Sequence, residues 1–112
     1  MAFENQNFRQ RLGDFFIMEF TVENVTDASA YSWLWTMKID ANSPVIFQKE
    51  DTDSDVTIDG NKVLVSMSSA ETKTGLDPGV YEHELQFFDS QGLPGVGAAG
   101  TVTFLKPLQV RT

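Results

Sequence analysis

The chain has 112 residues, no cysteine and a formal net charge of −8, with 8 Lys and Arg against 16 Asp and Glu. This length allows one domain with a single two-layer core, the missing cysteine excludes disulfides and thiol chemistry, and the acidic balance argues against nucleic acid as a partner. No apolar run approaches the roughly 18 residues that span a bilayer, so no membrane partner is expected.

The N-terminal segment, residues 1–11, is polar apart from two phenylalanines. It has neither the basic start nor the apolar stretch of a signal peptide, so we expect synthesis and folding inside a cell. Two alternatives stay open for its structure: a frayed first strand, or an arm that becomes ordered on a neighbouring subunit. In the second case the candidate assembly residues are Phe3, Phe8, Arg9 and Arg11. Residues 12–112 are expected to form a single domain.

Two segments alternate between large apolar side chains and other residues, which is the pattern of a half-buried strand. The first is 16–22 and the second is 31–39. In the second segment Trp33 and Trp35 are predicted core residues, and Ile39 is expected on the same face. A break at 42–44 precedes a short strand at 45–48 that is suited to a sheet edge.

A hairpin is predicted next, because the apolar segments 55–58 and 62–67 flank Asp59-Gly60, a strong turn signal. The following residues, 68–75, combine a serine cap, good helix formers and a closing glycine. They predict one helical turn that crosses from one sheet to the other.

The most specific motif is Asp77-Pro78-Gly79-Val80-Tyr81, whose D-x-G-x-Y spacing is that of a tyrosine corner. In this motif the tyrosine hydroxyl bonds back to upstream backbone as a core strand begins, so Asp77, Gly79 and Tyr81 are predicted to have structural roles. The strand itself is predicted at 79–89. Its inward face would carry Tyr81, His83, Leu85 and the core residue Phe87.

Residues 90–100 are rich in glycine and contain a proline, which predicts a loop, and 101–105 then form the last strand. The chain therefore has about seven predicted strands and no substantial helix. This pattern predicts an all-β fold: an immunoglobulin-like antiparallel β-sandwich with Greek-key connections and little or no helix.

Catalytic chemistry has little support in these residues. The single histidine, His83, lies on the apolar face of the predicted core strand, where an immunoglobulin domain carries its second disulfide cysteine. A structural histidine is favoured over a general base, because the neighbouring Glu82 and Glu84 point to the opposite face and cannot orient it. Those two carboxylates are favoured as ordinary exposed acids over a glycosidase pair. We therefore expect no catalytic residue and no enzyme activity.

The segment Asp51-Thr52-Asp53-Ser54-Asp55 resembles the start of a calcium-binding loop, with acids at positions 1, 3 and 5. The sixth position is Val56 instead of glycine, and no glutamate closes the loop. A solvated acidic loop is favoured over a Ca²⁺ site. The glycines of 92–100 lack the lysine and the helix of a phosphate-binding loop, so no metal and no cofactor is expected.

The last third of the chain resembles a known group of proteins. Leu76 to Gly92 follows an L-x-x-G-x-Y-x-(Y/H)-(D/E)-(L/I)-Q strand with a D-x-x-G turn. Gly100 to Phe104 resembles a G-x-(V/I)-x-V strand, with phenylalanine at the last position. Gly13-Asp14-Phe15-Phe16 is similar to the G-D-(T/S)-(F/W) opening of the same group. These patterns are typical of small β-sandwich structural proteins of tailed bacteriophages, including the N-terminal domain of baseplate upper proteins. The resemblance covers about residues 12–106, although the loop at 92–100 is longer than usual.

The resemblance implies a non-enzymatic virion structural protein of the tail, baseplate, neck or head decoration, made and folded in the host cytoplasm. Its partners would be other copies of itself and other virion proteins, in a homo-oligomer within the assembled particle. Exposed strand edges and the N-terminal arm would make the contacts. The alternative function is a carbohydrate- or receptor-binding β-sandwich module that holds its ligand with loops at one end.

Overall fold

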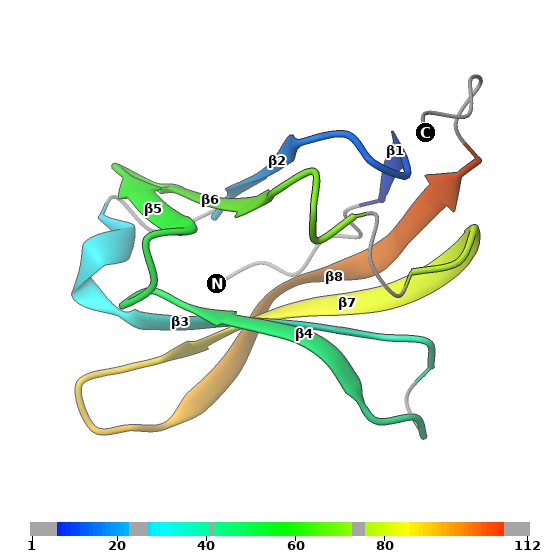
Figure 1. Ribbon diagram of the computed structural model, residues 1–112. Coiled ribbons are helices and arrows are strands. Elements are labelled where there is room, and N and C mark those ends of the chain that lie inside the picture. The colour runs from blue at the N-terminus through cyan, green and yellow to red at the C-terminus, as the bar shows by residue number, and fades with distance from the viewer. Residues whose placement is uncertain (1–6, 23–26, 41, 73–75, 107–112) are drawn as a thin grey trace.

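The computed structural model describes residues 7–22, 27–40, 42–72 and 76–106. Two sheets face one another, and Figure 1 shows the smaller lying over the larger. The larger sheet has the strand order β1-β8-β7-β3-β4, with bounds Phe8–Arg11, Pro94–Leu105, Gly79–Phe88, Ser32–Lys38 and Val45–Glu50. The smaller sheet has the order β2-β6-β5, with bounds Phe16–Thr21, Lys62–Met67 and Val56–Asp59. The predicted all-β immunoglobulin-like sandwich is confirmed.

The chain crosses between the sheets at β1–β2, β2–β3, β4–β5 and β6–β7, so that β3 lies beside β7 and β2 beside β6. All strand pairs are antiparallel except β1 with β8, which is parallel. The sole helical element in the described residues is a 3₁₀ turn, η1, at Ala28–Ala30. None of the helical structure in this part of the chain is long and apolar enough to cross a membrane.

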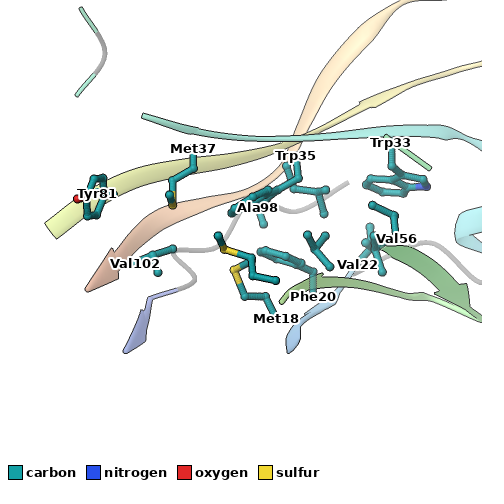
Figure 2. Close-up of a cluster of buried hydrophobic side chains, with 14 of the residues drawn as sticks. Met18, Phe20, Val22, Trp33, Trp35, Met37, Val56, Tyr81, Ala98 and Val102 are labelled. Atoms are coloured by element: carbon teal, nitrogen blue, oxygen red, sulfur yellow. The ribbon is translucent and has the colours of Figure 1, made fainter. Parts of the chain in front are cut away.

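The core lies between the two sheets and is built from alternating positions of both (Figure 2). The two tryptophans of β3 are buried, and each indole N–H has an acceptor, as buried tryptophan requires. Trp33 Nε1 donates to the carbonyl oxygen of Ala28 at 2.7 Å, and Trp35 Nε1 donates to His83 Nδ1 at 3.0 Å. The expected inward position of Ile39 is wrong: β3 ends at Lys38, and the Ile39 side chain is 57% exposed.

The hairpin of β5 and β6 forms where it was expected, but its turn is displaced by one residue. Asp59 is paired with Lys62, so the two loop residues are Gly60 and Asn61 instead of Asp59 and Gly60. Gly60 has a φ of 59°, a left-handed conformation that glycine adopts without strain. In the β6–β7 connection, Thr72 N–H donates to the carbonyl oxygen of Ser68 in a single turn, while residues 73–75 of the predicted helical turn lie outside the described residues.

The glycine-rich segment predicted as a loop is mostly strand. The loop between β7 and β8 is limited to Asp89–Leu93, and β8 then runs for 12 residues from Pro94. A Cβ atom on Gly95 would lie 2.3 Å from the Phe87 ring, and one on Gly97 would lie 3.0 Å from the Trp33 ring. The glycines are therefore needed because aromatic side chains from β7 and β3 lie directly on the β8 backbone.

The loop itself is tightened by Asp89, whose carboxylate accepts hydrogen bonds from the N–H groups of Gln91 and Leu93. Gly92 takes a φ of 78° and donates its N–H to the Asp89 carbonyl. The D-x-x-G turn recognised in the sequence is thus a short hairpin loop. The longer loop expected at 92–100 does not form, because residues 94–100 belong to β8.

Candidate functional site

The Asp77–Tyr81 turn is held by the hydroxyl group of its tyrosine. Tyr81 Oη donates to the carbonyl oxygen of Asp77 at 2.7 Å and accepts the Asp77 N–H at 3.2 Å. The ring is buried, with its centroid 5.6 Å from that of Phe104. Gly79, at a φ of 151°, makes the bend between the two residues. These contacts fix the direction in which β7 enters the larger sheet, and they occupy the tyrosine hydroxyl with the backbone of Asp77.

His83 is buried in the core, on the face of β7 opposite to Glu82 and Glu84. Its imidazole lies among the rings of Phe8, Phe20 and Trp35, with centroid distances of 5.6, 5.6 and 6.3 Å. Because Nδ1 accepts the indole N–H of Trp35, the neutral ring carries its proton on Nε2. The histidine therefore joins β7 to β3 and β1 inside the sandwich.

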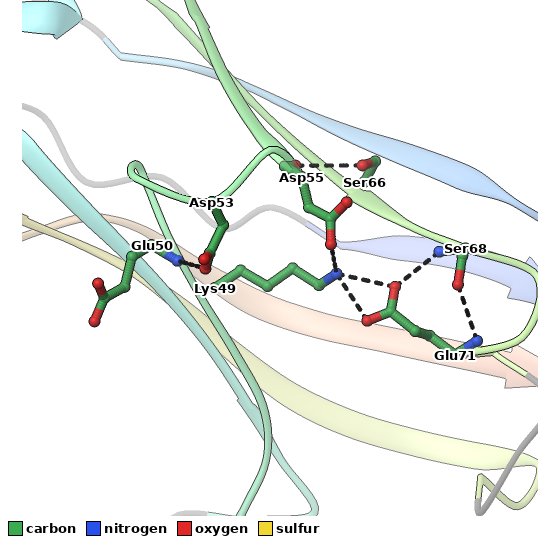
Figure 3. Close-up of polar contacts among 7 residues, drawn as sticks. All are labelled: Lys49, Glu50, Asp53, Asp55, Ser66, Ser68 and Glu71. Atoms are coloured by element: carbon green, nitrogen blue, oxygen red, sulfur yellow. Dashed lines mark hydrogen bonds and ion pairs between the residues drawn. The ribbon is translucent and has the colours of Figure 1, made fainter.

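A second polar cluster, absent from the sequence-based predictions, is centred on Lys49 in β4 (Figure 3). The lysine is only 4% exposed, and its Nζ lies 2.6 Å from Asp55 Oδ2 and 2.9 Å from both carboxylate oxygens of Glu71. Glu71 is fixed in turn by the N–H of Ser68 at 2.9 Å, while the Ser68 hydroxyl accepts the N–H of Glu71. The Lys49 cluster joins an edge strand of the larger sheet to the β4–β5 and β6–β7 connections.

The environment of Lys49 favours its charged form. Burial alone would lower its pKa, but hydrogen bonds and attraction from Asp55 and Glu71 outweigh that effect and raise the pKa above the ordinary lysine value. The sequence did contain a signal for this inward position, because residues 47 and 49 share a face in any strand that starts at 45.

The acidic segment 51–55 uses two of its carboxylates to hold the fold. Asp53 Oδ2 accepts the backbone N–H of Glu50 at 2.8 Å, and Asp55 pairs with Lys49 (Figure 3). Within the described ranges, no group of three or more acidic, histidine or cysteine side chains is arranged to hold a metal ion. The segment therefore connects β4 to β5 and caps the end of β4.

A hollow of about 700 Å³ lies on the outer face of the larger sheet. Residues of β3, β4, β7 and β8 line it, including Thr36, Lys38, Gln48, Glu82, Glu84 and Gln86. No hydrogen bond or ion pair joins the side chain of Lys38, Glu82 or Glu84 to another residue of the described ranges. Sequence reasoning placed Glu82 and Glu84 on this exposed face but gave no sign of the concavity, which depends on the twist of the whole sheet.

The residues of the candidate N-terminal arm fall into two groups. Phe3 lies outside the described residues. Phe8, Arg9 and Arg11 belong to β1, the edge strand beside β8. Phe8 is half-buried, and its ring centroid lies 5.5 Å from that of Phe20 in the opposite sheet. Residues 8–11 are therefore a strand of the larger sheet, and residues 1–6 of the candidate arm lie outside the described residues.

The predicted core residue Phe87 is half-buried at the end of β7 where the β7–β8 hairpin begins. Its ring packs against Tyr31 and Trp33, with centroid distances of 5.5 and 5.8 Å, and covers Gly95.

Comparison with known proteins shows the fold and no more. No protein-family model and no curated protein matches the chain. Among solved structures, CopC from Methylosinus trichosporium OB3b is 10% identical, with a TM-score of 0.52 over 93% of this chain and 89% of that protein. A protein named as a glycoside hydrolase from Bacteroides vulgatus ATCC 8482 is 14% identical, with a TM-score of 0.48 over 89% of this chain and 16% of that protein. The class defined by fold and likeness is therefore a small all-β sandwich.

Proposed function

We propose that this chain is a non-enzymatic structural protein of a bacteriophage virion that acts through packing of its copies and of neighbouring virion proteins. The observation that carries the proposal is the β7–β8 hairpin. Its strand, its D-x-x-G turn at Asp89 to Gly92 and its returning strand follow the pattern of phage sandwich proteins. The short Asp89–Leu93 loop also matches the tight turn of that group.

The polar groups inside the sandwich support the same proposal. His83 and Lys49, two buried ionisable side chains, both bond to other parts of the fold. Their partners are the indole of Trp35 and the carboxylates of Asp55 and Glu71. These groups hold strands together, as expected of a protein whose task is to keep a rigid shape within an assembly.

The hollow over β3, β4 and β7 is the feature that bears on the alternative of a carbohydrate-binding module. Its lining supplies amide, hydroxyl and carboxylate groups that can bond to a polyol, but no Phe, Tyr or Trp on which a sugar ring could stack. A sugar there would rest on hydrogen bonds alone, which compete poorly with water. We therefore rank this function second.

The test is to examine purified particles of a phage whose genome encodes the chain. We expect mass spectrometry of density-banded particles to find the protein at a fixed ratio to the other virion proteins, and antibody labelling to mark one part of the particle in electron micrographs. Absence of the chain from banded particles would refute the proposal. Binding on a glycan array that Glu82→Gln and Glu84→Gln abolish would favour the alternative.

A further inference from the structure

Two open sheets expose four strand edges: β1 and β4 in the larger sheet, β2 and β5 in the smaller. A free edge presents unpaired backbone N–H and C=O groups to any other strand, and proteins usually protect such edges with short strands, inward charges or covering segments. The four edges of this sandwich differ in how well the described residues protect them. That difference indicates where another chain can add.

The edge at β4 is protected in two ways. Its next-to-last residue, Lys49, turns its charge into the sandwich, where both of its carboxylate partners belong to the same chain. At the end of β4, the backbone N–H of Glu50 is already bonded to the Asp53 carboxylate at 2.8 Å. An added strand at this edge would have to displace Asp53.

The edges at β1 and β5 are short, with four residues each. β1 carries two arginines, and the guanidinium of Arg11 donates to the carbonyl oxygen of Lys106 at 3.1 Å. Beside β5 lies the 3₁₀ turn η1, whose first N–H, that of Ala28, donates to the carbonyl oxygen of Gly60 at 2.7 Å. Both edges are therefore poor templates for a further strand.

The edge at β2 is different. It has six residues, and no strand of the described ranges pairs on its far side. Ser66 N–H bonds to Asp55 on the β5 side, and Val22 N–H bonds to Asn61 on the β2 side. Because successive residues of a strand direct their backbone N–H and C=O groups to opposite sides, the register places those of Ile17, Glu19 and Thr21 on the side away from β6, toward the free edge.

The side chains along this edge are apolar at one end. Phe15 is 57% exposed and Ile17 is 51% exposed, two positions apart. Glu19, which would normally discourage strand addition, lies 3.4 Å from Lys62 on the neighbouring strand and is partly neutralised by it.

We propose that two copies of this chain pair antiparallel through β2, with a twofold axis at Ile17, so that two three-stranded sheets become one continuous sheet. The occupant is a second copy because this edge is self-complementary. Centred on Ile17, the pairing sets Ile17 against Ile17 of the partner subunit and Phe15 against Glu19 of the partner subunit. Centred on Glu19, it would set two like charges opposite one another, which is destabilising. The inference rests on the proposed function, for which it names the first assembly contact.

The absence of cysteine from the chain allows a direct test by disulfide cross-linking of Ile17→Cys under mild oxidation. Opposed residues in a hydrogen-bonded antiparallel pair have Cα atoms about 5.5 Å apart, which a disulfide spans. Val45→Cys is the matched control, because Val45 is 45% exposed and begins the protected edge strand β4. We expect Ile17→Cys to form a disulfide dimer rapidly and nearly completely, and Val45→Cys to form it slowly and partially.

Sedimentation velocity of the cysteine-free protein provides the second measurement. We expect a reversible dimer with a dissociation constant on the order of 10 µM, as for a small interface. Ile17→Lys should raise this constant by about tenfold or more, because like charges would face each other across the axis. Its circular dichroism spectrum and Tm should match those of the parent.

Equal cross-linking of the two cysteine variants, or a monomer unaffected by Ile17→Lys, would overturn the β2 pairing. Both measurements use purified protein, so they fail independently of the particle experiment. A protein that dimerises through β2 but is absent from virions would refute the proposed function and keep the interface. A protein that is present in virions but does not dimerise through β2 would keep the proposed function and refute the interface.

Discussion

Lys49 lies on an edge strand with its ammonium group inside the sandwich, held by two carboxylates from different connections. A charge in this position costs desolvation energy, which its two ion pairs must offset. The arrangement has a second effect, because an inward charge on the edge strand β4 makes that edge a poor template for another strand. One residue thus contributes both to the closure of the sandwich and to its resistance against unwanted strand addition.

Replacing Lys49 by Met keeps most of the length of the unbranched side chain and removes the charge. Asp55 and Glu71 would lose their partner, but their side chains are 47% and 29% exposed and can turn toward water. We therefore expect a loss of about 1–2 kcal/mol in the free energy of unfolding, below the cost of breaking a fully buried pair. Urea denaturation at pH 7 measures this. The control Lys62→Met, in an exposed pair with Glu19, should change stability by less than about 0.5 kcal/mol.

The pH dependence of this pair of variants follows from the raised pKa of Lys49. A group whose pKa is higher in the folded protein stabilises it fully below the unfolded value, here 10.5, and loses that contribution as the pH rises through the folded value. The stability difference between the parent and Lys49→Met should therefore be constant from pH 7 to about pH 10 and shrink above it. A difference that stays constant up to pH 11.5 would contradict the role of the ion pair.

At the scale of the element, the glycines of β8 are explained by the side chains that pack on this strand from other strands. Glycine is disfavoured in strands because it brings no side chain and loses much backbone entropy. In β8 the missing Cβ atoms of Gly95 and Gly97 make room for the rings of Phe87 and Trp33. Gly97 is also the extra residue of a β-bulge, since Leu85 pairs with Ala98 and Gln86 with Val96.

Gly95→Ala should destabilise the protein by about 1–2 kcal/mol, because the new methyl group overlaps the ring of Phe87, which Tyr31 and Trp33 hold in place. The substitution Phe87→Ala removes the ring that the new methyl group would overlap. In a double-mutant cycle, the cost of Gly95→Ala should therefore largely vanish in the Phe87→Ala background, with a coupling of about 1 kcal/mol or more. Thermal and urea unfolding provide the measurement, and additive costs would show that the ring and the glycine do not interact.

A strand can be predicted from the sequence when its own residues show which face is buried. The strands at 16–22, 31–39 and 79–89 bury one face each, so that alternation alone located them to within a residue or two of β2, β3 and β7. The first half of β8 was not predicted as strand, because its glycines are required by the Phe87 and Trp33 rings on other strands. A local sequence pattern does not show such contacts. The hollow could not be predicted for a related reason: it is formed jointly by four strands of the larger sheet, none of which carries a distinctive local pattern there.

At the scale of the whole molecule, assembly must overcome the charge of the chain. Each copy carries −8, so two copies repel one another at long range. The β2 edge meets this condition with apolar side chains and with the pairing of Glu19 and Lys62, whereas the outer face of the larger sheet presents Glu82 and Glu84 without partners in the described ranges. The smaller sheet is therefore the better face on which to begin an assembly.

This charge gives the proposed dimer a characteristic salt dependence. Raising the salt concentration screens the repulsion between copies, since the Debye length falls from about 10 Å at 0.1 M to about 3 Å at 1 M. The dissociation constant should therefore fall several-fold between low and high salt in sedimentation experiments, whereas an interface made of intermolecular ion pairs would weaken. Glu19→Gln, at the interface, should tighten the dimer at low salt. The control Glu82→Gln makes the same change in net charge on the other sheet and should have a smaller effect, because its distance from the axis allows more screening. Equal effects of the two variants would place the contact elsewhere.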